Sequence, residues 1–205
     1  MLAGNLFDKY NTKNPIARML CNNFLRSVIE LVRSTGARDI YEAGCGEGAL
    51  ILHVASQIHG VRIRGSDFSE QVIGTARENA REANQNCELK VTSIYDLKAE
   101  TDAAELVVCC EVFEHLEDPE LALTVVSRLA RPYLLVSVPR EPLWRLLNVV
   151  RGKYIGAFGN TPGHLQHWSK GSFVRLLRRY VDIEEIRMPV PWIMVLCRSR
   201  GSTRG

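Results

Sequence analysis

The 205-residue sequence lacks the features that mark several broad classes of protein. No apolar run reaches the roughly 18 residues of a membrane span. Residues 1–10 lack the basic region and apolar core of a secretion signal. The six cysteines include no C-x-x-C pair and no regular spacing, so we expect reduced thiols without a disulfide framework. These absences predict a soluble, cytoplasmic protein with no membrane span.

A strong charge imbalance is also absent. The formal net charge is +3, without a dense stripe of lysine and arginine, so the composition does not favour a nucleic-acid partner. No repeat, low-complexity tract or Gly/Ser linker divides the chain. With 46% hydrophobic residues it can bury one sizeable core. We therefore expect a single domain over residues 1–205 and make no prediction of its oligomeric state.

Short apolar runs alternate with longer segments of helical period. The runs predict strands and the longer segments predict helices, in the order strand 39–43, helix 48–59, strand 61–67, helix 69–83, strand 87–92, strand 106–110, helix 119–130 and strand 133–138. Such alternation builds right-handed βαβ units and a parallel sheet. Ahead of them, a helix that begins at Pro15 and ends at Gly36 makes residues 1–38 a predicted N-terminal helical cap.

The alternation ends at Pro139. Residues 140–168 are rich in proline, glycine, tryptophan and histidine, which favours an ordered lid inserted into the domain. The alternative is an amphipathic helix around Trp144 that packs on the domain. Basic residues of this lid would suit a carboxylate, a phosphate or weak contact with an anionic membrane surface; they are Arg140, Arg145, Arg151 and Lys153. A helix and two strands are predicted next, at 169–180, 181–187 and 192–197.

A glycine-rich turn joins the strand predicted at 39–43 to the helix predicted at 48–59. It lies in the segment DIYEAGCGEG, residues 39–48. Its glycines, Gly44, Gly46 and Gly48, permit positive φ and let a ligand lie against the backbone. Dinucleotide enzymes and phosphate-binding loops share such turns, but the G-x-G-x-x-G spacing and a Lys-Ser/Thr pair are absent here. Glu42 places a negative charge beside the loop, which suits a cationic ligand better than a pyrophosphate.

An acidic residue ends the second predicted strand. Asp67 stands about 20 residues beyond the loop, where a carboxylate can accept hydrogen bonds from both hydroxyls of a ribose. Phe68 follows directly and can pack against an adenine ring. Asp67 could instead cap the helix that begins near Ser69, and the two roles are compatible. The position predicts a ligand that contains a nucleoside.

A family resemblance rests on three segments, EAGCGEG, SDFS and VVCCEVFEHLEDPE. They are similar to the class I S-adenosylmethionine-dependent methyltransferases, near the small-molecule branch that includes ubiquinone-biosynthesis O-methyltransferases. The similarity covers residues 39–139. It implies a Rossmann-like α/β fold with a seven-stranded sheet, mostly parallel with an antiparallel last strand, and with helices on both faces.

The resemblance also implies a cofactor site for S-adenosylmethionine. The methionine part would be held by Glu42, Gly44, Cys45, Gly46 and Gly48. Asp67 would hold the ribose, and Ser93 and Ile94 would lie beside the adenine. Many relatives carry an aspartate where this chain has Ser93, so either Ser93 makes a weaker contact or Asp96 takes the role.

The acceptor is expected beside the cofactor, outside the carboxyl ends of the strands. This places it near residues 111–115 and the segment after Pro139. Methyl transfer is an in-line displacement, so alignment can supply most of the catalysis. His164 and His167 are candidate bases for a hydroxyl acceptor, and Glu111 is a candidate catalytic carboxylate.

Glu111, Glu114 and His115 have the spacing E-x-x-E-H. With His164 they would form a possible set of ligands for a divalent cation, and the pattern resembles the metal site of small-RNA terminal 2′-O-methyltransferases. Ubiquinone-type enzymes share the E-x-x-E-H part, and many methyltransferases without a metal also carry it. We therefore favour a site without a metal.

These features predict an S-adenosylmethionine-dependent methyltransferase that acts on a small-molecule acceptor, with transfer to oxygen preferred. One alternative is an RNA-end 2′-O-methyltransferase that uses a divalent metal. The other is a non-catalytic subunit with a methyltransferase fold. A non-catalytic domain has no need of Glu42, three loop glycines and Asp67, so their presence favours an enzyme.

Overall fold

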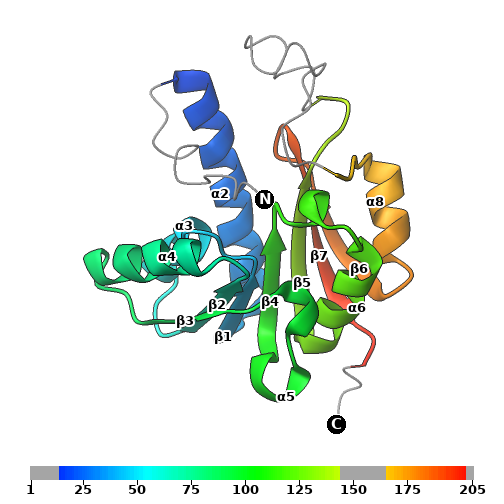
Figure 1. Cartoon of the computed structure of the whole chain (residues 1–205). Coiled ribbons are helices and arrows are strands. Elements are labelled where there is room, and N and C mark those ends of the chain that lie inside the picture. Colours follow the sequence, from blue (N-terminus) through cyan, green and yellow to red (C-terminus); the bar gives the residue numbers. More distant parts are fainter. Residues whose placement is uncertain (1–13, 144–164, 202–205) are drawn as a thin grey trace.

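The computed structural model describes residues 14–143 and 165–201. Seven strands form one sheet in the order β3-β2-β1-β4-β5-β7-β6 (Figure 1). They are β1 Asp39–Ala43, β2 Arg62–Asp67, β3 Cys87–Val91, β4 Ala104–Cys110, β5 Ala130–Pro139, β6 Val181–Arg187 and β7 Trp192–Ser199. Only the pairs made by β7 are antiparallel, with β5 on one side and β6 on the other. The predicted fold, including the antiparallel last strand, is confirmed.

The helices follow the predicted segments closely. The described helices are α2 Pro15–Thr35, α3 Ala49–Gln57, α4 Glu70–Glu82, α5 Ala99–Asp102, α6 Pro119–Leu129, α8 Lys170–Leu177 and the 3₁₀ helices η1 Ile94–Asp96 and η2 Phe113–His115. The sequence did not predict α5, η1 or η2, because such short elements show no periodicity. Within the described ranges, no helix is long and apolar enough to cross a membrane.

Helix α2 begins and ends where its sequence predicts. The Asn14 side chain accepts hydrogen bonds from the backbone N–H groups of Ile16 and Ala17, and Pro15 occupies the first turn. At the other end Gly36 has a φ of 66° and donates its N–H to Arg33. These caps fix the helix that packs along the sheet beside α3.

The two faces of the sheet carry separate apolar layers. Side chains alternate along a strand, so β4 contributes Val107 and Cys109 to one layer and Leu106 and Val108 to the other. Helices α6 and α8 cover the first layer, whereas α2 and α3 cover the second. All six cysteines are free thiols. Because both faces are covered, the loops at the strand ends are the part of the sheet open to ligands.

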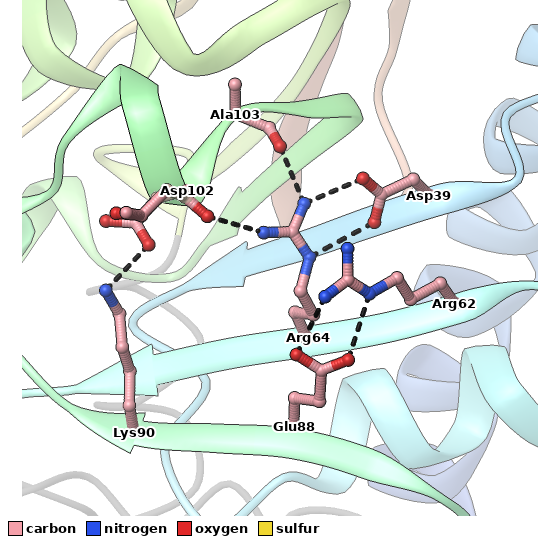
Figure 2. Close-up of polar contacts among 8 residues, drawn as sticks. Asp39, Arg62, Arg64, Glu88, Lys90, Asp102 and Ala103 are labelled. Carbon is pink, nitrogen blue, oxygen red and sulfur yellow. Dashed lines mark hydrogen bonds and ion pairs between the residues drawn. The ribbon is translucent and has the colours of Figure 1, made fainter.

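A buried arginine ties the amino ends of β1 and β4 to β2. The Arg64 guanidinium donates to both oxygens of the Asp39 carboxylate, at 3.1 and 2.7 Å. It also donates to the backbone carbonyls of Thr101 at 3.0 Å and Ala103 at 2.6 Å (Figure 2). Arg64 is only 6% exposed, and a buried guanidinium is tolerated only with such partners. This cluster stabilises the edge of the sheet opposite the glycine loop.

Candidate active site

The glycine loop adopts the backbone that its residues predict. Gly44, Gly46 and Gly48 have φ angles of 78°, 54° and 83°, all in the left-handed region. The backbone N–H groups of Gly44 and Cys45 donate to the carbonyl of Ser66, at 2.8 and 2.9 Å, so the loop is fixed to the end of β2. A Cβ added at Gly46 would meet no described atom within 4 Å. The loop therefore has an open side on which a ligand can approach the main chain.

The Cys45 side chain lies beneath this loop. It is 5% exposed, and a Cβ added at Gly65 on β2 would lie 3.1 Å from the Cys45 Cβ and 3.2 Å from its Sγ. Burial raises the pKa of the Cys45 thiol well above its usual value, and the nearby carboxylates of Glu42 and Asp67 raise it further. The side chain is thus an unreactive packing group, whereas the backbone of Cys45 remains part of the loop.

Asp67 connects the end of β2 to the glycine loop. One carboxylate oxygen accepts the backbone N–H of Gly46 at 3.1 Å, and the other accepts the N–H of Ser69 at 3.0 Å. Ser69 is the N-cap of α4, with its hydroxyl accepting from Val72 at 3.4 Å. Each carboxylate oxygen can accept a second hydrogen bond, so Asp67 keeps capacity for hydroxyl donors.

Glu42 is a buried carboxylate at the end of β1. It is 3% exposed, and its Oε2 has no hydrogen-bond partner in the part of the chain that the structure describes. Burial raises the pKa of Glu42 well above its usual 4.5; a hydrogen bond from the Ile51 backbone opposes this shift, and the Asp67 charge adds to it. A buried acceptor without a partner is costly. A cationic group beside Glu42 would remove that cost.

The residues predicted to lie beside adenine follow β2 and β3. Phe68 is 55% exposed, which leaves its ring available at the end of β2. Ser93 is the N-cap of η1, and its hydroxyl accepts the N–H of Tyr95 at 3.3 Å. Ile94 is buried in the same turn, whereas Asp96 is exposed at its end. Both alternatives for the polar adenine contact thus lie on one short helix.

Glu111 directly follows β4 and has a φ of 60°, which is uncommon for a residue other than glycine. Its N–H donates to the Ser137 carbonyl at 3.1 Å. Its carboxylate accepts the Ser137 hydroxyl at 3.2 Å and the indole N–H of Trp192 at 2.6 Å. The Trp192 ring lies 5.0 Å from that of Phe24 on α2. This arrangement joins the turn after β4 to β5, β7 and α2.

The sequence did not indicate a role for Trp192 or Ser137. An antiparallel last strand begins at the edge where its parallel neighbour ends, and Trp192 is the first residue of β7. That topology was the signal that could have placed Trp192 beside the predicted acceptor region. Its pairing with Glu111 depends on tertiary structure alone.

The end of the predicted lid lies on η2. The backbone N–H groups of Leu165 and Gln166 both donate to the carbonyl of Glu114, at 2.8 and 3.0 Å. The Gln166 amide donates to the carbonyl of Leu116 at 3.3 Å. His167 is exposed in this stretch. His164 and Trp144 lie outside the described residues.

Trp168 holds the same stretch against the end of β5 and α8. Its carbonyl accepts the N–H of Glu141 at 2.9 Å, so the stretch that begins at Leu165 runs beside the carboxyl end of β5. Its ring is 5.6 Å from Phe173 on α8. The described end of the predicted lid is therefore held by both η2 and the end of β5.

No group of three His, Cys, Asp or Glu side chains in residues 14–143 and 165–201 is arranged to hold a metal ion. Both carboxylate oxygens of Glu111 accept hydrogen bonds from protein donors. The fourth ligand considered from the sequence, His164, falls outside those ranges.

The chain is similar to known methyltransferases along much of its length. Residues 40–133 match a methyltransferase domain family. A ubiquinone biosynthesis O-methyltransferase from Coxiella burnetii is 26% identical over 183 residues, which cover 80% of this chain and 76% of that protein. The enzyme of the same name from Methylococcus capsulatus is 29% identical over 158 residues, covering 69% of this chain and 65% of that protein.

Solved structures share the fold. Magnesium protoporphyrin IX methyltransferase from Synechocystis PCC 6803, crystallised with bound S-adenosylhomocysteine (SAH), matches with a TM-score of 0.72 at 20% identity over 94% of each chain. The sheet order, the glycine loop and the matched domain agree with one another. The chain is therefore similar, in its matched domain, its relatives and its fold, to S-adenosylmethionine-dependent methyltransferases.

Proposed function

We propose that the carboxyl ends of β1, β2 and β4 bind S-adenosylmethionine and that the enzyme methylates a hydroxyl oxygen of a small molecule. One observation carries the proposal. The buried oxygen of Glu42, the open side of Gly46 and the carboxylate of Asp67 come together at one edge of the sheet. The names of the relatives, which are O-methyltransferases, support oxygen as the methylated atom.

The residues at this edge fit the cofactor in both charge and shape. Glu42 would face the cationic methionine part, because its buried Oε2 has no partner among the described residues. Gly46 leaves room for the ligand against the loop, with Gly44, Cys45 and Gly48 completing the turn. Asp67 would accept the ribose hydroxyls while it holds the loop through Gly46. In the same assignment the adenine ring is bounded by Phe68, Ser93 and Ile94.

The acceptor would lie between the turn after β4 and residues 165–168. The bound cofactor supplies an electrophilic methyl group on its sulfonium. The chain orients the acceptor and excludes water, with Trp192 held by Glu111 and packed on Phe24. His167 or His164 would take the hydroxyl proton, and the exposure of His167 allows the proton to pass to solvent. We assign Glu111 the task of fixing Trp192 beside the acceptor.

This proposal treats residues 1–205 as a single domain. Residues 1–38 would cap the sheet through α2, and residues 140–168 would cover the acceptor. Trp168 lies at the described end of that segment, beside the carboxyl end of β5.

Two measurements test the proposal. Calorimetry should show that S-adenosylmethionine and SAH each bind at one site per chain. A screen of phenols, alcohols, amines and carboxylic acids should then show SAH formation and a mass gain of one methyl group with a hydroxyl compound. Binding without turnover of any hydroxyl compound, but with turnover of an amine, would refute oxygen as the acceptor atom. Absence of binding would refute the cofactor site.

A further inference from the structure

The first glycine of the loop touches the turn after β4. A Cβ added at Gly44 would lie 2.5 Å from Cγ2 and 3.3 Å from Cγ1 of Val112, so the Val112 side chain packs directly against the Gly44 backbone. Gly44 has a φ of 78° and donates its N–H to Ser66. A change in the position or mobility of the loop at Gly44 must therefore reach Val112.

The residue before Val112 is held firmly. Glu111 has a left-handed backbone, which for a residue other than glycine persists only when its surroundings enforce it. Those surroundings are the hydrogen bonds from Ser137 and from the Trp192 indole, at 3.2 and 2.6 Å. The turn is thus fixed where it leaves β4, and η2 is the element that follows Val112 directly.

The turn after β4 holds Leu165 and Gln166 through backbone atoms. The Glu114 carbonyl on η2 accepts two N–H groups, from Leu165 and Gln166. The Leu116 carbonyl accepts the Gln166 side-chain amide. Only Phe113 separates Val112 from Glu114, so one short turn touches the cofactor loop at one end and residues 165–168 at the other.

We propose that Val112 is a positioning residue that couples the cofactor loop to residues 165–168. This inference rests on the proposed cofactor site. A ligand that lies on the loop reduces the motion of Gly44, and the packed Val112 side chain carries that restriction into η2. The two hydrogen bonds to Glu114 then open less often. In this way residues 165–168, which would lie beside the acceptor, are held more firmly once the methyl donor is bound.

Hydrogen exchange resolved to single amides tests the coupling with SAH as the probe. In the wild-type protein, saturating SAH should slow exchange at Leu165 and Gln166 about fivefold or more, the lower range of typical coupling between sites. In Val112→Ala, SAH should still bind by calorimetry, but the slowing at these amides should fall to less than twofold. Val112→Ile keeps the branched contact with Gly44 and should restore the slowing.

A matched control separates coupling from general loss of packing. Val125 on α6 is half-buried against the same apolar layer but is distant from the loop in the sequence and on another element. Val125→Ala removes the same two methyl groups and should keep the full effect of SAH. If Val112→Ala does not fold, Gln166→Ala provides the second variant. It removes the bond to Leu116 at the other end of the turn and should reduce the slowing at Leu165 without changing SAH affinity.

The outcomes distinguish this inference from the proposed function. Full slowing in Val112→Ala would overturn the role of Val112. Normal SAH binding to the wild-type protein without slowing at Leu165 and Gln166 would overturn the coupling and leave the cofactor site intact. Failure of SAH to bind the wild-type protein would overturn the proposed site itself.

Discussion

Cofactor binding should release a proton from Glu42. Its carboxyl group is 3% exposed, and burial raises its pKa well above 4.5, which favours the protonated form in the ligand-free protein. A cation placed beside it favours the ionised form instead. Because the complex holds fewer protons than the free protein, binding strengthens as the pH rises.

The expected size follows from linkage. While Glu42 is protonated in the free protein and ionised in the complex, affinity for SAH should rise by up to tenfold per pH unit, or about 1.4 kcal/mol. The measurement should run from about pH 5.5 to 7, below the pKa of roughly 7.7–8.0 of an α-amino group, so that this group of the ligand stays mostly protonated. Calorimetry within this range, in two buffers of different protonation enthalpy, should report a proton release that rises toward one per SAH bound where Glu42 is protonated in the free protein.

Glu42→Gln is the matched control. Glutamine has the shape of the protonated acid and cannot ionise, so the variant should bind SAH more weakly, release no proton and show no dependence on pH in this range. It should also melt at a higher temperature than the ligand-free wild type at neutral pH. A raised pKa means that the unfolded chain loses this proton first, so the wild-type protein loses stability as the pH rises above 4.5. Tight SAH binding by the wild type without proton release would refute the reasoning.

Three further changes test other parts of the structure. Asp67→Ala should weaken SAH binding by a few kcal/mol in calorimetry while the protein still folds, because it removes a charged acceptor and the bond to the loop; unchanged affinity in the folded variant would contradict the assignment. Gly46→Val should abolish SAH binding, because a β-branched residue resists a φ of 54° and fills the open side of the loop. A soluble variant that binds SAH normally would show that the ligand does not lie against the loop at Gly46. Burial raises the pKa of Asp102, but hydrogen bonds from Lys90 and the Lys98 backbone lower it below 3.8 overall, so its contribution to stability is present above that pH and lost as the pH falls further. Lys90→Met should therefore shift the midpoint of acid unfolding, followed by circular dichroism, to higher pH; an unchanged midpoint would argue against this ion pair.

The backbone of the glycine loop could be predicted because its residue types impose their own geometry. Glycine is the residue that enters positive φ without strain, and all three loop glycines do so. Asp67 could be placed because a strand boundary and a fixed separation from the loop put it at the same edge of the sheet. These are local properties of the chain, and they do not depend on distant partners.

The burial of Arg64 could not be predicted in this way. An arginine within a strand ordinarily indicates a solvated side chain. Here the guanidinium is buried because Asp39 and the carbonyls of Thr101 and Ala103 surround it, and two of these partners lie on α5 and the segment after it (Figure 2). Because α5 is too short to show a helical periodicity, the sequence indicated neither this helix nor the carbonyls around it that accept hydrogen bonds from Arg64.

The E-x-x-E-H segment shows why spacing alone does not decide chemistry. The same letters suit a metal site or a turn that positions an acceptor, and the difference lies in where the carboxylate of Glu111 points. Its direction is set by a left-handed backbone and by Trp192, which is 81 positions away in the sequence. Trp192 reaches it only because β7 runs antiparallel between β5 and β6 and begins at the carboxyl edge. The order of the last two strands, more than the motif, therefore determines what Glu111 can do.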